Sequence, residues 1–426
     1  HYFASAFVKR KREGSMNPHV NLSKLLALRS IRHDPIISAL ENAILLGENG
    51  MQERNECCSR LITAAENLGL KGNLLSRYLL HVIIYRSNIV SEIMERTGLP
   101  PGNSLRHIFY QDIALLHPLL ITPTSNFLGE KILDDYEPTK KTYDKTEDFL
   151  LPWLEAANST EDYAEALLTF YARYGCGDIA AYAGFHWDES KKRLCGIAHF
   201  ECLRMKDLIG YQRQKEQLIQ NTRAFVQGKP ANHVLLVGAR GTGKSSAVKA
   251  LVGEFEENSL RLVQVTKEQL RKLPEIMNAL RGYAGRKFVL FLDDISFEDS
   301  DAEFKAVKSA IEGGVSSCPP NVRLYATSNR RHLVRETWCE REQNELYRND
   351  SINENISLSD RFGLIIHYHT PDQDEYLEII DHMLSQRGIH LSPEELRIAG
   401  LRWEMTHSGR SGRTAQQFVA YYLGNH

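Results

Sequence analysis

One eight-residue stretch constrains the fold more than any other part of the chain. Residues 238–245 are Gly-Ala-Arg-Gly-Thr-Gly-Lys-Ser, which fits the pattern G-x-x-x-x-G-K-[ST]. The stretch follows an apolar run of strand length, 233–237, and leads into residues 246–251, which favour a helix. Strand, glycine-rich loop and helix in this order predict a loop whose backbone N–H groups, with the helix N-terminus, hold a polyphosphate. A chance match in a glycine-rich turn is the alternative, and the flanking strand and helix disfavour it.

The side chains at the end of this loop have separate expected roles. Lys244 is expected to reach the terminal phosphates of the ligand. Ser245 places a hydroxyl where it can ligate a magnesium ion held between those phosphates. The expected phosphate-binding residues are Gly238, Ala239, Arg240, Gly241, Thr242, Gly243, Lys244, Ser245 and Ser246.

A second acidic motif follows an apolar run. Residues 287–294, Lys-Phe-Val-Leu-Phe-Leu-Asp-Asp, have the length of a buried strand and end in two carboxylates. In a parallel sheet the carboxyl ends of the strands meet at the ligand crevice. We therefore expect Asp293 to hold Mg²⁺ through a water, and Asp294 to orient and partly deprotonate the water that attacks the terminal phosphorus. A solvated Asp-Asp turn would be the better interpretation if no phosphate loop preceded it.

The pattern of apolar residues changes along the chain. From residue 22 to about 168 these residues recur at helical spacing, and from residue 206 apolar strands alternate with helices, as in a parallel sheet covered on both faces. The predicted strands are 233–238, 260–265, 288–293, 322–328 and 364–369, and helices at 375–385, 393–406 and 413–422 form a small lid. The expected regions are a non-native or disordered leader (1–15), a helical N-terminal domain (16–182), a β-hairpin and linker (183–205), an α/β core with a five-stranded parallel sheet (206–371) and a helical lid (372–426).

Composition excludes several classes of protein. The 52 lysines and arginines against 54 aspartates and glutamates give a net charge of −2, which offers no support for a protein that coats a polyanion. The seven cysteines form no C-x-x-C pair, so we expect reduced thiols and a cytoplasmic location. We find no apolar run approaching the ~18 residues that cross a bilayer, so membrane insertion is not expected.

With the motifs at 238–245 and 287–294, the chain resembles the AAA+ ATPases. This resemblance implies ATP as the nucleotide and Mg²⁺ as its metal ion. The end of the fourth strand, Ala326–Arg330, resembles their sensor 1, in which Asn329 would help to position the lytic water. Residues 359–363, Ser-Asp-Arg-Phe-Gly, resemble the box that supplies an arginine finger. The resemblance implies that Arg361 enters the site of a neighbouring subunit, and hence that the protein is a homo-oligomer.

Two further segments carry the resemblance. Residues 409–413, Gly-Arg-Ser-Gly-Arg, resemble sensor 2, which implies that Arg413 contacts the γ-phosphate, with Arg410 as the alternative. Residues 208–213, which include Ile209, resemble the segment that packs against adenine. Each of the three arginines could instead be an ordinary surface residue.

The resemblance narrows to a bacterial AAA+ family catalogued only as a domain of unknown function. Its supporting segments are Asp207–Lys215, Phe291–Glu298, Glu312–Gly314, Tyr325–His332 and Ser357–Gly363. Resemblance to this family implies that the protein is an ATPase, but it does not indicate the biological process in which the protein acts. Whether the client is a protein or a nucleic acid is therefore not decided by the sequence. The basic cluster Arg330, Arg331 and His332 is interpreted as a subunit contact or part of the site, in preference to a nucleic-acid contact.

One departure from the common AAA+ pattern affects the expected turnover. Many members carry Asp-Glu where this chain has Asp293-Asp294, and aspartate is one methylene shorter. Glu298 is the reserve candidate for the base. The favoured function is ATP hydrolysis that drives conformational change on a client. The alternative is a slow ATP-gated switch, scaffold or loader with little turnover.

Overall fold

The structure is a computed structural model that describes residues 20–139, 150–201, 203–255, 257, 259–295, 301–312, 318–329, 361–407 and 409–425. The chain divides into two compact units. The first contains the chain up to Ile93 together with Pro100–Tyr171, and the second contains Met94–Leu99 together with the chain from Ala172 onward. Each unit is described by itself.

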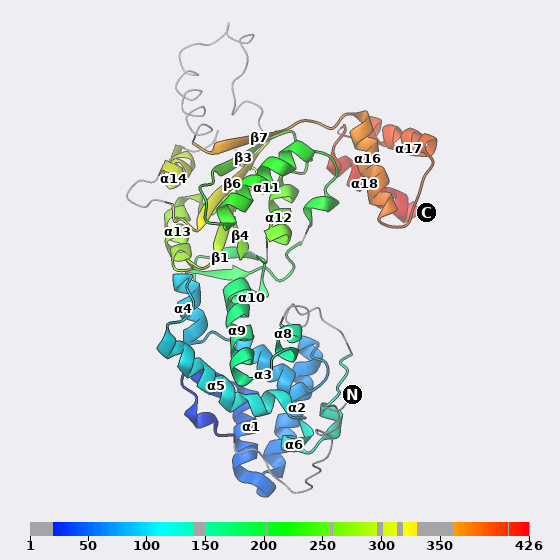
Figure 1. The fold of residues 1–426 in the computed structure, drawn as a ribbon. Coiled ribbons are helices and arrows are strands. Elements are labelled where there is room, and N and C mark those ends of the chain that lie inside the picture. Colours follow the sequence, from blue (N-terminus) through cyan, green and yellow to red (C-terminus); the bar gives the residue numbers. More distant parts are fainter. Residues whose placement is uncertain are drawn as a thin grey trace, which may run out of the picture. The chain divides into compact units, whose positions relative to one another are not determined.

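Helices build the first unit (Figure 1). Local sequence explains how they begin and end: the Asp34 carboxylate accepts hydrogen bonds from the N–H groups of Ile36 and Ile37, with Pro35 at the first helical position. Gly69, at a φ of 74°, ends α2. The helices of this region are α1 (Pro35–Leu46), α2 (Met51–Leu68), α3 (Leu74–Tyr85), α4 (Ile89–Thr97), α5 (Asn103–Ile121), α6 (Ser125–Leu128), α8 (Leu151–Glu155) and α9 (Thr160–Tyr174), of which α4 and α9 continue into the second unit.

The second unit is built on one seven-stranded sheet with the order β2-β1-β4-β5-β6-β3-β7. The β1–β2 pair is antiparallel and all other neighbours run parallel. The strands are β1 (Gly184–Asp188), β2 (Arg193–Gly196), β3 (His233–Gly238), β4 (Leu260–Val265), β5 (Lys287–Leu292), β6 (Val322–Ser328) and β7 (Gly363–Tyr368).

The prediction of a five-stranded sheet is therefore wrong in its count. The five parallel strands exist, but the hairpin β1–β2 adds two more, because β1 pairs with the outer edge of β4 through Gly184 and Leu262. An unpaired strand edge leaves backbone N–H and C=O groups without partners, and the hairpin satisfies those of β4. This pairing joins residues that are far apart in sequence, so local patterns do not reveal it.

Alternate residues of β3, which lies between β6 and β7, pack against helices on opposite faces of the sheet. Val234 and Leu236 of β3 join a core with the helices α11 (Gln212–Val226) and α12 (Lys244–Phe255). Leu235 and Val237 join a core with α13 (Leu273–Arg281) and α14 (Asp301–Glu312) on the other face (Figure 1). Because helices cover both faces of the sheet, residues that point to either face are apolar, and the strands appear in sequence as continuous apolar runs. A short helix, α10 (Gly177–Ala181), precedes β1.

Three helices form the C-terminal lid: α16 (Gln373–Ser385), α17 (Pro393–Thr406) and α18 (Gly412–Asn425). Two capping boxes begin the first two helices, Asp372 with Glu375 and Ser392 with Glu395. The lid has its own core around Tyr376, a residue without exposed surface.

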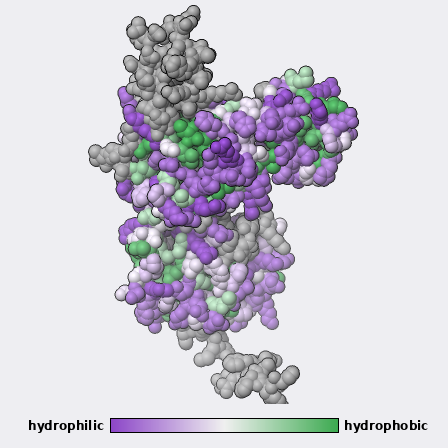
Figure 2. Space-filling model, turned by 45° about the horizontal axis from the view of Figure 1, so that its top comes forward, coloured by the Kyte–Doolittle hydropathy of each residue, from purple (hydrophilic) through white to green (hydrophobic). Residues whose placement is uncertain are grey.

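Within the part of the chain that the structure describes, no helix has both the length and the apolar character needed to cross a membrane. Figure 2 shows hydrophilic residues over most of the visible face of each unit.

The first residue of β3, His233, is expected to make stability depend on pH. Its Nδ1 accepts a hydrogen bond of 2.9 Å from the Leu324 N–H, and burial, with the nearby Arg323 charge, lowers its pKa to about 4. The unfolded chain binds the proton more readily, so stability should fall as the pH drops from about 6.5 to 4, by at most about 1.4 kcal/mol per pH unit.

His233→Asn, whose amide oxygen can accept the same bond, is expected to flatten this part of the pH profile of thermal unfolding. The exposed His390→Asn is the control and should keep the wild-type slope. An unchanged slope in His233→Asn would show that another group carries the acid sensitivity.

Candidate active site

The glycine-rich loop lies between the end of β3 at Gly238 and the start of α12 at Lys244. Gly241 and Gly243 have φ values of 77° and 84°, a backbone region that residues with a Cβ rarely adopt. Gly238 has a packing reason: a Cβ there would lie 2.1 Å from the carbonyl oxygen of Tyr368 on β7. The first glycine of the motif therefore permits the close approach of two neighbouring strands.

Lys244 is 5% exposed and turns back onto its own loop. Its Nζ donates to the carbonyl oxygens of Gly238 and Ala239, at 2.9 and 2.7 Å, and to Oδ1 of Asn329 at 3.1 Å. These three contacts use all three N–H donors of the ammonium group. Burial lowers the pKa of Lys244 to about 8, while Asp294 and Asp293 act in the opposite direction.

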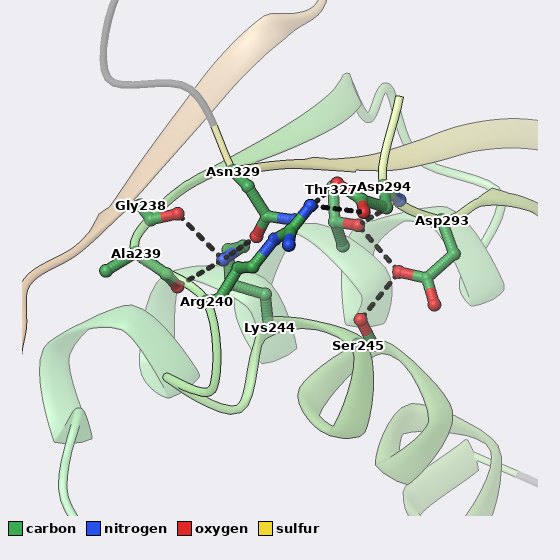
Figure 3. A network of polar contacts seen from close by, with 9 residues as sticks. All are labelled: Gly238, Ala239, Arg240, Lys244, Ser245, Asp293, Asp294, Thr327 and Asn329. Atoms are coloured by element: carbon green, nitrogen blue, oxygen red, sulfur yellow. Dashed lines mark hydrogen bonds and ion pairs between the residues drawn. The ribbon is translucent and has the colours of Figure 1, made fainter. Parts of the chain in front are cut away.

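Ser245 and Asp293 form a pair of oxygen ligands across the loop (Figure 3). The Ser245 hydroxyl donates to Oδ1 of Asp293 at 2.6 Å, and Thr327 donates to the same oxygen at 2.7 Å. Magnesium prefers a few carboxylate or hydroxyl oxygens together with phosphate and water. The donor set fits Mg²⁺, with Ser245 and Asp293 as the residues that would hold it.

Asp294 follows directly and adopts a left-handed backbone with a φ of 52°. Its N–H donates to the Thr327 hydroxyl at 2.8 Å, and its Oδ1 accepts a hydrogen bond from the Asn329 amide. Arg240 forms an ion pair with its Oδ2 at 3.8 Å. Asn329 thus contacts both Lys244 and Asp294 and joins the phosphate loop to the acidic motif (Figure 3).

These residues surround a cavity of about 500 Å³, within the usual range of ligand sites of roughly 300–1,000 Å³. Core and lid both contribute to its wall. The backbone N–H of Gly412 in α18 donates to the Gly241 carbonyl at 2.9 Å, so the lid contacts the phosphate loop directly. Further lining residues are Asp207, Leu208, Ile209, Gly210, Tyr211, Lys215, Tyr368, Ile379, Met383, Arg413 and Gln416.

The cavity brings together most of the residues singled out in the sequence. It is lined by Ile209, Arg240, Gly241, Thr242, Gly243, Lys244, Ser245, Ser246, Asp293, Asp294, Asn329 and Arg413. Gly238 and Ala239 do not line it; their carbonyl groups hold Lys244.

The two other arginines lie elsewhere in the described structure. Arg361 precedes β7 and does not line the cavity of its own chain. Arg410 forms an ion pair with Glu404 at 3.1 Å. The leader, Glu298 and the basic cluster 330–332 lie outside the described residues.

Sequence reasoning missed several lining residues. Lys215 of α11 is 9% exposed and donates to the Leu208 carbonyl at 2.6 Å, although lysines on amphipathic helices are normally solvated. Thr327 lies within the segment 326–330 that resembles sensor 1, but that resemblance implies a role for Asn329 alone. Residues such as Ile379 and Met383 look in sequence like any apolar positions of a lid helix.

The fold and the site together define a class of protein. The structure has the features of an AAA+ P-loop fold: a mostly parallel sheet, a glycine-rich loop between β3 and α12, paired acids after β5, an asparagine after β6 and a small helical lid. The predicted fold class is confirmed apart from the number of strands.

A family model described as "Protein of unknown function (DUF815)" matches residues 180–426, which is more than half of the chain. The chain belongs to this family. The expected resemblance to an AAA+ family of unknown function is thereby confirmed.

Solved structures with a similar fold include RuvB of Thermotoga maritima, a Holliday junction branch migration motor, at 18% identity and a TM-score of 0.36 over 51% of this chain and 63% of that chain. PCH-2 of C. elegans matches at 13% identity and a TM-score of 0.37, over 52% of this chain and 65% of that chain. Each match thus spans less than two thirds of the length of the solved protein. At such low sequence identities and TM-scores, neither match carries information on function. No curated protein matches this chain.

Lys244→Ala is expected to abolish measurable binding of a fluorescent ATP analogue, because the change removes the ammonium group that the loop places against the terminal phosphates. Lys249→Ala, on the same helix and outside the cavity lining, is the matched control and should bind as the wild type does. Thermal unfolding without nucleotide checks that both variants fold. An unchanged ATP affinity in Lys244→Ala would contradict the phosphate-loop assignment.

Proposed function

We propose that this protein binds ATP with Mg²⁺ and hydrolyses it, and that the resulting conformational change acts on a protein or nucleic-acid client. One observation carries the proposal. The phosphate-loop residues Lys244 and Ser245 face Asp293, Asp294 and Asn329 across a single cavity that the lid also lines. This is the set of groups that phosphoryl transfer to water requires.

Each group in the site has a separate role in this proposal. The loop N–H groups and Lys244 hold the β- and γ-phosphates, and Ser245 and Asp293 hold the metal ion. Asp294 accepts a proton from the attacking water, and Asn329 orients that water. Arg413, at the start of α18, contacts the γ-phosphate from the lid side. When bound, Mg²⁺ supplies positive charge to the phosphate oxygens.

ATP binding has to replace the contacts that Lys244 makes with the Gly238 and Ala239 carbonyls. Phosphate oxygens are charged acceptors and form the stronger hydrogen bonds, so the exchange is favourable. The arriving negative charge also raises the pKa of Lys244 and keeps its amine protonated.

The arginine finger acts between subunits in this proposal. Arg361 lies just before β7 and outside the lining of the cavity in its own chain, which supports a role in a neighbouring site. The active form is then a homo-oligomer, with hydrolysis at the subunit interface. A cytoplasmic location remains a prediction from the cysteine pattern.

A slow ATP-gated switch is the second candidate function, and one observation favours it. Asp294 is already engaged by Asn329 and Arg240, and its side chain is one methylene shorter than glutamate. Because these two contacts hold the short side chain in place, it cannot move toward a more distant water without breaking one of them. Steady-state hydrolysis with and without candidate polymers separates the two functions: a low rate that no polymer raises would favour the switch.

Asp294→Asn is expected to keep ATP binding and to lower the hydrolysis rate by at least about 100-fold, because the amide preserves the shape and removes the proton acceptor. Phosphate release measures the rate, and Asp381→Asn, an exposed position in the lid, is the control. If Glu298→Gln loses activity and Asp294→Asn does not, the base is Glu298.

Arg361→Ala is expected to lower the rate of hydrolysis by about 10³-fold or more, because the finger neutralises charge that develops in the transition state. Mixing Arg361→Ala with Lys244→Ala should restore part of the activity, since the second variant cannot bind ATP but still carries Arg361. Cross-linking shows whether the two variants assemble together. A mixture that assembles and stays inactive would rule out the action of Arg361 between subunits.

A further inference from the structure

Thr327, near the end of β6, contacts both residues of the acidic motif, Asp293 through its carboxylate and Asp294 through its backbone N–H. It is 2% exposed. Its hydroxyl donates to Oδ1 of Asp293 at 2.7 Å and accepts the N–H of Asp294 at 2.8 Å (Figure 3). A hydroxyl has one proton to donate, and an ionised carboxylate can only accept. The two contacts therefore fix the orientation of this hydroxyl.

The first contact sets where Asp293 points. Its Oδ1 lies between two hydroxyl groups, that of Thr327 on the sheet side and that of Ser245 on the loop side. Without Thr327, the carboxylate keeps the loop contact and loses the one that ties it to the sheet. Groups that orient a metal ligand from behind typically contribute about 10- to 100-fold to metal affinity.

The second contact stabilises the turn that separates the two acids. Asp294 has a left-handed backbone, which is unfavourable for a residue with a Cβ. Thr327 binds the chain here twice, since its hydroxyl accepts the N–H of Asp294 and its carbonyl accepts that of Ile295 at 2.9 Å. This turn directs Asp293 toward Ser245 and Asp294 toward Asn329.

We infer that Thr327 is a positioning residue, which orients Asp293 for the metal ion and Asp294 for the attacking water through one hydroxyl group. The inference rests on the proposed function, because it assigns Thr327 to the metal and water positions of that site. A purely structural threonine at this place would affect stability alone. The two roles are therefore separable by the magnesium dependence of nucleotide binding.

The test compares Thr327→Val, which keeps the shape and loses both hydrogen bonds, with Thr327→Ser, which keeps the hydroxyl. Thr222→Val is the matched control: Thr222 is fully buried on α11 and bonds to the Leu218 carbonyl and the Tyr325 hydroxyl, outside the cavity lining. A fluorescent ATP analogue is titrated in EDTA and then at increasing Mg²⁺ concentration. Thr327→Ala provides the same comparison if the valine variant does not fold.

Thr327→Val is expected to need at least about tenfold more Mg²⁺ for half of the magnesium-dependent gain in affinity, with its affinity in EDTA within about twofold of the wild type. Thr327→Ser should restore the wild-type magnesium response, and Thr222→Val should not change it. An unchanged magnesium response in Thr327→Val, or the same shift in Thr222→Val, would overturn the inference and leave the proposed function intact. A wild-type protein that binds no nucleotide under either condition would overturn the proposed function itself.

Discussion

The candidate site depends on the parallel pairing of β3, β5 and β6. Register places Val237 beside Ser328 and Leu292 beside Ala326, so the three strands end at one edge of the sheet. The loop after β3, the acids after β5 and Asn329 after β6 therefore meet without any long excursion of the chain. The contact of Asn329 with both Lys244 and Asp294 follows from this arrangement.

A second constraint is electrostatic. The site holds a buried cation, Lys244, beside two carboxylates, and every donor of the ammonium group has an acceptor within the chain. These contacts within the chain satisfy the ammonium group, which explains how its buried charge is tolerated. The same contacts oppose nucleotide binding until phosphate oxygens replace them. This balance is compatible with both an active ATPase and a switch.

Much of the site could be predicted because its signals are local. The loop motif, the apolar strands and the acids after Leu292 are short patterns, and the rule for parallel sheets brings them together. Pairing across long sequence distances could not be predicted, which is why the predicted hairpin was not assigned to the edge of β4 and the sheet was given five strands. Burial of Lys215 and the double contact of Thr327 depend on tertiary packing and leave no signal in a single sequence. The domain limits stay a prediction.

The central claim is that the cavity between core and lid is the ATP site, and a crystal structure with a non-hydrolysable ATP analogue and Mg²⁺ tests it most directly. The account predicts that the terminal phosphates lie against residues 241–245 and that the metal ion lies between Ser245 and Asp293. It also predicts that the adenine ring lies near Ile209. Phosphates bound elsewhere, or a metal ion that contacts neither Ser245 nor Asp293, would contradict the account.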